Sequence, residues 1–144
     1  METSTKEVKT TKPATPAASS SKKKRGKRTV TNGLLCIKAT YNNTIVTVTD
    51  EAGNVLTSAS AGSCGFRGSR KSTPYAAQVA SEKALTAAAQ TFNMKSVAAK
   101  VSGVGMGRES SLRGAVASGV EISSISDMTS LRFGGCRARK PPRN

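Results

Sequence analysis

Two glycine-rich segments of the chain carry cations at spacings that suit the binding of phosphate groups. The first spans residues 62–71 and has glycines at positions 62, 65 and 68. Glycine has no Cβ, so such a backbone can approach a sugar-phosphate chain closely. Arg67, Arg70 and Lys71 supply donors for phosphate oxygens. A solvated surface loop is the alternative, and we favour RNA binding.

The second segment contains Gly103, Gly105 and Gly107 directly before Arg108. We expect it to join a strand to a helix, where backbone N–H groups and the helix dipole favour an anion. Its spacing matches neither G-x-G-x-x-G nor G-x-x-x-x-G-K-[ST], so no nucleotide cofactor is predicted. Two interpretations stay open: a tight turn, or a phosphate-binding turn with Arg108 and Arg113 as RNA ligands.

Catalytic and metal-binding side chains are scarce. The chain has no histidine, which excludes acid–base or nucleophilic catalysis by a His-containing set. Its three cysteines, Cys36, Cys64 and Cys136, are far apart and form no C-x-x-C pair. We therefore predict no metal site, and reduced thiols that behave as small buried or half-buried apolar side chains.

Most of the charge excess lies in two terminal arms. The net charge of +15 divides into +7 for residues 1–29, +3 for residues 30–131 and +5 for residues 132–144. The first segment has too few apolar residues to offset its ordering entropy, so we predict a disordered basic arm before a core and a basic tail. The candidate RNA-binding residues of the arms are Lys23, Lys24, Arg25, Lys27, Arg28, Arg132, Arg137, Arg139, Lys140 and Arg143.

A basic chain of this size attracts any polyanion, so the partner must be narrowed by other features. The Lys-rich run at residues 22–28 has no Trp, Phe or Leu to enter a bilayer interface, which disfavours a membrane partner. No helix-turn-helix, zinc-finger or basic-zipper pattern is present to bind DNA. Five Phe or Tyr residues and no Trp provide no stacking platform of the RRM kind. These features favour a large structured RNA. An organelle transit peptide is Arg-rich and poor in acids, whereas this chain begins with Glu2, Glu7 and mostly lysines, so we expect a cytoplasmic protein.

The elements that position these segments begin with three predicted strands. Residues 34–41 alternate with a period of two, which predicts one buried face. Asn42 and Asn43 tolerate positive φ and predict a tight hairpin into the β-branched run 44–49. A second turn at residues 50–54 leads into a strand over 55–61. The expected buried side chains of the first strand are Leu35, Ile37, Ala39 and Tyr41.

Helices and strands alternate in the rest of the core. Thr73 is a suitable N-cap and Pro74 a suitable first residue for an alanine-rich helix that continues to Phe92. A strand over 97–102, a helix over 109–118 and a strand over 120–125 follow. The predicted class is α/β with a mixed five-stranded sheet and two helices, in the order β-β-β-α-β-α-β of the ribonuclease H-like architecture.

Hydrolases of that architecture hold metal ions with several converging carboxylates. Here the first strand has no acid, Asp50 and Glu51 fall at a turn, and Glu121 falls beside a helix end. A metal-dependent nuclease is therefore the weaker hypothesis, and a protein that coats nucleic acid generally is the other alternative.

Two motifs resemble a known family. Residues 62–78 and 103–110 resemble the ribosomal small-subunit protein family numbered eleven, and Asp127-x-Thr129 with Gly135-Cys136-Arg137 resembles its bacterial and organellar branch. The resemblance implies a ribonuclease H-like fold without catalysis on the platform of the small subunit. The implied partners are small-subunit ribosomal RNA and neighbouring platform proteins, with the messenger RNA, near its exit, as a further candidate. The implied RNA contacts are Arg67, Arg70, Lys71, Arg108, Arg137, Lys140 and Arg143.

Overall fold

The elements follow one another in the predicted order β-β-β-α-β-α-β. A computed structural model describes residues 29–143, so Lys23, Lys24, Arg25, Lys27 and Arg28 of the basic N-terminal arm lie outside the described residues. The elements are β1 (Asn32–Ala39), β2 (Thr44–Asp50), β3 (Val55–Ser60), the short 3-10 helix η1 (Gly68–Ser72), α1 (Pro74–Phe92), β4 (Ser96–Ser102), α2 (Gly107–Ala117) and β5 (Glu121–Asp127).

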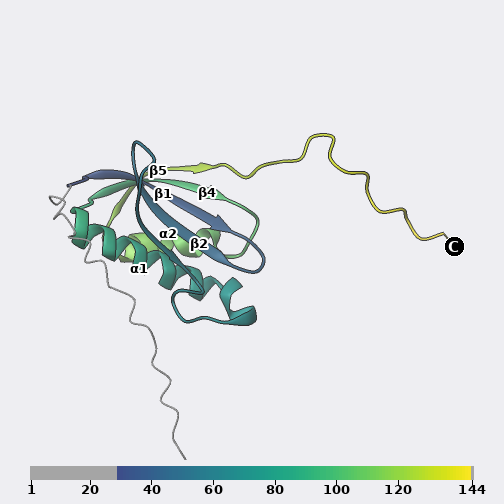
Figure 1. Ribbon diagram of the computed structural model, residues 1–144, viewed down its shortest axis with the longest axis horizontal. Helices are drawn as coiled ribbons and strands as arrows, with labels where there is room; N and C mark the ends of the chain where they lie inside the picture. Colours follow the sequence, from purple (N-terminus) through teal and green to yellow (C-terminus); the bar gives the residue numbers. More distant parts are fainter. Residues whose placement is uncertain (1–28, 144) are drawn as a thin grey trace, which may run out of the picture.

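The strands form one mixed sheet in the order β3-β2-β1-β4-β5. β2 pairs antiparallel with β1 and β3, whereas β4 pairs parallel with β1 and β5. Both helices cover the same face of this sheet (Figure 1). The α/β class with a mixed five-stranded sheet and two helices, predicted from the order of strands and helices in the sequence, is confirmed.

The first strand buries one face, with one exception to the prediction. Leu35, Ile37 and Ala39 are at most 1 % exposed, as the alternation predicted. Tyr41 is 75 % exposed, because β1 ends at Ala39 and the alternation stops with the strand. Tyr41 is therefore outside the core.

The turn after β1 forms by a different route from the one predicted. Thr40 Oγ1 donates to the Asn43 carbonyl at 3.0 Å and accepts from the Asn43 N–H at 3.2 Å. The predicted hairpin between β1 and β2 is confirmed. Among the described residues, Asn93 is the only non-glycine with positive φ, so the tolerance of Asn42 and Asn43 for positive φ is not used in this turn. The Thr40 side chain closes the turn with ordinary backbone angles instead.

Small residues bring the helices close to the sheet and to each other. Helix α1 begins where predicted, with the Thr73 side chain accepting from Ala76 N–H and proline first. The Ser81 hydroxyl donates to the Ser111 carbonyl on α2 at 2.7 Å. A Cβ on Gly114 would lie 2.7 Å from the Gln78 carbonyl oxygen. The close crossing of α1 and α2 therefore depends on residues without bulk.

The strand directions bring several connections to one end of the sheet. β1, β3, β4 and β5 all end there and β2 begins there, and we call it the carboxyl end of the sheet. Residues 40–43, 61–73 and 103–106 and the C-terminal segment from Met128 onward all start at this end (Figure 1). The acidic turn with Asp50 and Glu51 lies at the opposite end.

Candidate nucleic-acid interface

The loop between β3 and α1, residues 61–73, is held in a defined conformation. Phe66 N–H donates to the Ala61 carbonyl at 3.2 Å, and Arg70 N–H donates to the Arg67 carbonyl at 3.3 Å. From α1, Lys83 Nζ donates to the Ser63 carbonyl at 3.2 Å. These bonds order the loop before any ligand binds, which lowers the entropy cost of binding.

The three predicted cations of this loop are available to an anion. Arg67 and Arg70 are exposed and Lys71 is half-buried. Within residues 29–143 the only ion pairs are Arg108–Asp127 and Arg113–Glu109, so none of the three has an acidic partner there. Two hollows meet at Phe66 and Arg67, one continuing along Arg70 and the other along Lys71. Their lining contains no carboxylate, which suits them to phosphate.

An aromatic pair supports the loop at its junction with α1. The rings of Phe66 and Tyr75 meet edge to face, with centroids 5.9 Å apart. Tyr75 is 66 % exposed and Phe66 is half-buried. The sequence predicts no RRM-type stacking platform, and this aromatic pair beside the cations was not among the predicted features.

The glycines of the 103–107 turn are explained by close packing. A Cβ on Gly103 would lie 2.0 Å from the Ala39 carbonyl oxygen, and one on Gly105 would lie 2.3 Å from the Thr40 carbonyl oxygen. The Gly105 N–H donates to Ala39 at 3.0 Å, and the Gly103 N–H donates to Thr129 Oγ1 at 3.3 Å. Two of the three glycine N–H groups are thus used internally, which favours the tight-turn interpretation over a phosphate cradle.

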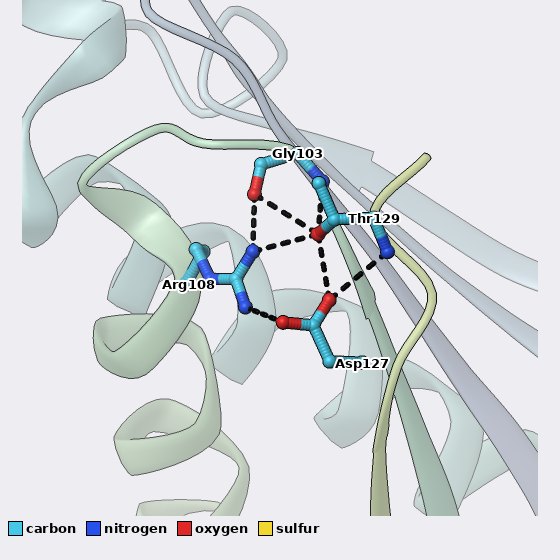
Figure 2. A network of polar contacts seen from close by, with 4 residues as sticks. All are labelled: Gly103, Arg108, Asp127 and Thr129. Carbon is cyan, nitrogen blue, oxygen red and sulfur yellow. Dashed lines mark hydrogen bonds and ion pairs between the residues drawn. The ribbon is translucent and has the colours of Figure 1, made fainter. Parts of the chain in front are cut away.

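Arg108 joins this turn to the start of the C-terminal tail (Figure 2). Its guanidinium forms an ion pair with Asp127 and donates to the Gly103 carbonyl, and it donates to Thr129 Oγ1 at 2.9 Å. The Arg108 side chain is 33 % exposed. We call Gly103, Arg108, Asp127 and Thr129 the tail clasp.

Asp127 is the acceptor at the centre of the tail clasp. It accepts from the Thr129 hydroxyl at 2.6 Å and from the Thr129 N–H at 3.0 Å. The Thr129 hydroxyl and then the Arg108 guanidinium, by hydrogen bonding to the charged form, lower the pKa of Asp127 from 3.8 to about 2. The Asp-x-Thr spacing is a local signal for this arrangement, because an Asp side chain commonly accepts from the residue two positions on.

The remaining predicted residues lie in different environments. Arg113 is exposed on α2, one turn after Glu109, and donates to its Oε1 at 2.6 Å. The tail side chains are all exposed, and the tail backbone extends away from the carboxyl end of the sheet (Figure 1). They are Arg132, Arg137, Arg139, Lys140 and Arg143. The structure thus brings Arg67, Arg70, Lys71, Arg108 and the start of the tail to one end of the sheet.

The three cysteines are free in the structure, as expected. Cys36 and Cys64 are half-buried, whereas Cys136 is exposed in the tail, which the expectation of buried or half-buried thiols did not anticipate. Across residues 29–143, no three His, Cys, Asp or Glu side chains gather as metal ligands would. In the same range, no helix has the length and apolar character that a bilayer crossing requires.

Comparisons with known proteins agree with the motif resemblance. The family model described as Ribosomal protein S11 matches residues 33–143. The chain is 53% identical over 127 residues to small ribosomal subunit protein uS11 of Alkalilimnicola ehrlichii, covering 88% of this chain and 97% of that protein. It is 53% identical over 121 residues to uS11 of Halorhodospira halophila, covering 84% and 92%. For uS11 of Coxiella burnetii the identity is 48% over 120 residues, covering 83% and 98%.

Proposed function

The chain belongs to the ribosomal protein S11 family, and from that premise we propose that it binds ribosomal RNA through the carboxyl end of its sheet. It is a structural, non-enzymatic component of the small ribosomal subunit. Its place is on the platform near the messenger RNA exit, beside neighbouring platform proteins, in ribosomes of the cytoplasm. Its loops and arms neutralise phosphates while RNA helices pack together.

The single observation that supports this most strongly is the common position of the cationic segments. The loop with Arg67, Arg70 and Lys71 and the start of the basic tail lie at one end of the sheet, where Asp127 and Glu109 are each paired with an arginine, whereas Asp50 and Glu51 lie at the other. An RNA surface that approaches the carboxyl end therefore meets the cations first. Charge separated in this way orients the protein during encounter.

Arg108 and Arg113 each form an ion pair within the protein, so we assign them different roles from those of the other cations. Arg108 holds Asp127 and Thr129, so its main role is to fix where the tail leaves the core, with its exposed part toward RNA. Arg113 is exposed and paired with Glu109, and an exposed pair of this kind is weak enough for a phosphate to displace. The tail residues Arg132, Arg137, Arg139, Lys140 and Arg143, with the N-terminal group from Lys23 to Arg28, neutralise further phosphates.

The salt dependence of RNA binding tests the proposed contacts. Each phosphate contact adds about 0.7 to 0.9 to the slope of log affinity against log salt, so Arg70→Gln should lower the slope by about 1. Lys95→Gln removes the same charge at the opposite end of the sheet and should leave the slope nearly unchanged. Binding of the full chain to small-subunit ribosomal RNA would be measured from 50 to 200 mM salt. Equal slopes for both variants would contradict RNA binding at the carboxyl end.

Sedimentation distinguishes this function from its rivals. A ribosomal component should migrate with small subunits in near-stoichiometric amounts on a sucrose gradient at moderate salt. A general nucleic-acid coat would spread over many fractions. RNA cleavage that requires a divalent metal ion and is lost on changing Asp50 or Asp127 would instead support the nuclease hypothesis.

A further inference from the structure

The face of the sheet opposite the two helices has no covering element among the described residues (Figure 1). Outward side chains of three strands lie side by side there. Cys36 is in register with Thr47 on one side and Lys100 on the other. Lys38 is likewise in register with Ile45 and Ser102. The register therefore makes one continuous surface across β2, β1 and β4.

A shallow hollow with mainly apolar walls lies in this surface, and Met128 from the segment after β5 closes one side of it. Ile45 is 43% exposed and Met128 is 59% exposed, so large apolar groups face solvent beside it. The lining contains two cations and no carboxylate. We define the open sheet face by six of the residues that line this hollow: Cys36, Lys38, Ile45, Thr47, Lys100 and Met128.

Charge excludes the occupants that this chain could provide itself. Residues 1–28 carry nine Lys or Arg and two Glu, and residues 132–144 carry five cations and no acid. Either arm is net positive and would be repelled by Lys38 and Lys100. A second copy docked face to face would oppose the same lysines to each other. The occupant must therefore be another molecule with negative charge.

The chemistry of the hollow favours protein over RNA. Its only cations are two lysines, without the arginines and glycine backbone of the 61–73 loop. A phosphate bound in the hollow would not bury its apolar walls. An apolar side chain bound between Ile45 and Met128 would remove both of these side chains from water, which is favourable. Lysines at the rim then add charge specificity to an apolar contact.

We propose that the open sheet face binds an acidic and apolar segment of a neighbouring small-subunit protein, an inference that rests on the proposed function. An apolar side chain of the segment fills the hollow, and two carboxylates pair with Lys38 and Lys100. These lysines lie on adjacent strands and two residues out of register, so their Cα atoms are about 8 Å apart from strand spacing and rise. Carboxylates at i and i+2 of a strand, or i and i+4 of a helix, come close to that separation.

Photo-cross-linking in purified small subunits tests this assignment. A benzophenone amino acid at Thr47 should cross-link to one protein segment that is rich in acids and apolar residues. The matched control places the same group at Thr86, which is exposed on α1 in the other layer, and should not capture that segment. Cross-links from Thr47 to ribosomal RNA, or none to protein, would overturn the inference.

A charge reversal combined with a compensating change in the partner provides a second readout, because restoration of the yield distinguishes a lost ion pair from a folding defect. Lys100→Glu should lower the yield of the Thr47 cross-link by about two- to fivefold, as expected for loss of a partly exposed ion pair. Changing a carboxylate of the captured segment to lysine should restore the yield. A yield insensitive to both changes would overturn the inference. Failure of the chain to migrate with small subunits would instead refute the proposed function, and this inference with it.

Discussion

Three glycine-to-alanine variants separate the packing role of the 103–107 turn from a phosphate-binding role. At Gly119, φ is 78° and no described atom lies within 4 Å of an added Cβ. Alanine at this position therefore has only the free-energy cost of a positive φ and no steric clash. At Gly105 an added Cβ would lie 2.3 Å from the Thr40 carbonyl oxygen, with no positive φ. Gly103 combines a positive φ of 99° with a steric clash, because an added Cβ would lie 2.0 Å from the Ala39 carbonyl oxygen.

The expected losses of stability follow from these geometries. A positive φ in an L-residue costs about 1 to 2 kcal/mol, so Gly119→Ala should lower the free energy of unfolding by about that amount. Gly105→Ala forces backbone against backbone, which no side-chain rotamer relieves, and should cost about 1 to 3 kcal/mol or more. Gly103→Ala should cost about the sum, a large fraction of the roughly 5 to 15 kcal/mol that stabilises a typical domain.

Urea unfolding followed by far-UV circular dichroism measures these losses, and RNA binding is measured on the fraction that remains folded. If the glycines serve packing, Gly103→Ala should lose more unfolding free energy than Gly105→Ala or Gly119→Ala. The RNA affinity of each folded molecule should change little. A Gly105→Ala variant of undiminished stability whose RNA affinity falls tenfold would refute the packing role and revive the phosphate cradle.

Three further outcomes follow from other contacts. The pKa of Asp127 is lowered from 3.8 to about 2 in the folded state. Its contribution to stability is therefore present above pH 3.8 and is lost as the pH falls through 2. Asp127→Asn should remove this pH dependence of the unfolding free energy between pH 4 and pH 2. Gly114→Ala should destabilise the α1–α2 crossing by about 1 to 3 kcal/mol in urea unfolding, because its Cβ meets the Gln78 carbonyl at 2.7 Å; a neutral effect would contradict the close crossing. Thr73→Ala should cost about 1 kcal/mol through loss of the α1 cap, and Thr73→Ser should retain most of that stability in the same assay.

The fold was largely predictable because its elements carry local signals. The alternation of Leu35 and Ile37 and the Thr73-Pro74 start of α1 each act over a few residues. The end of β1 was less predictable. Tyr41 continues the alternation in the sequence, but the Thr40 side chain closes the turn before it, and such a hydrogen bond depends on the folded geometry of Asn43.

The candidate site was predictable in its residue types and less so in their partners. Arg67, Arg70 and Lys71 could be chosen from charge and neighbouring glycines, and the structure leaves them without acidic partners among the described residues. Arg108 also follows a glycine run, yet its guanidinium is engaged by Asp127, 19 residues later in the chain. Contacts between distant segments depend on strand order, which local patterns do not specify.

The central position of β1 has a consequence for how the chain is completed during synthesis. β1 can pair with β2 as soon as the first hairpin has emerged, but its other edge pairs with β4, where Asn32 and Ser96 are 64 residues apart. Until β4 is made, this edge has unpaired N–H and C=O groups, which makes it open to wrong pairing. Pairings of such long range also form slowly. The tail clasp cannot close until Thr129 has been made, so the direction of the basic tail can be fixed only after every strand of the sheet has been synthesised.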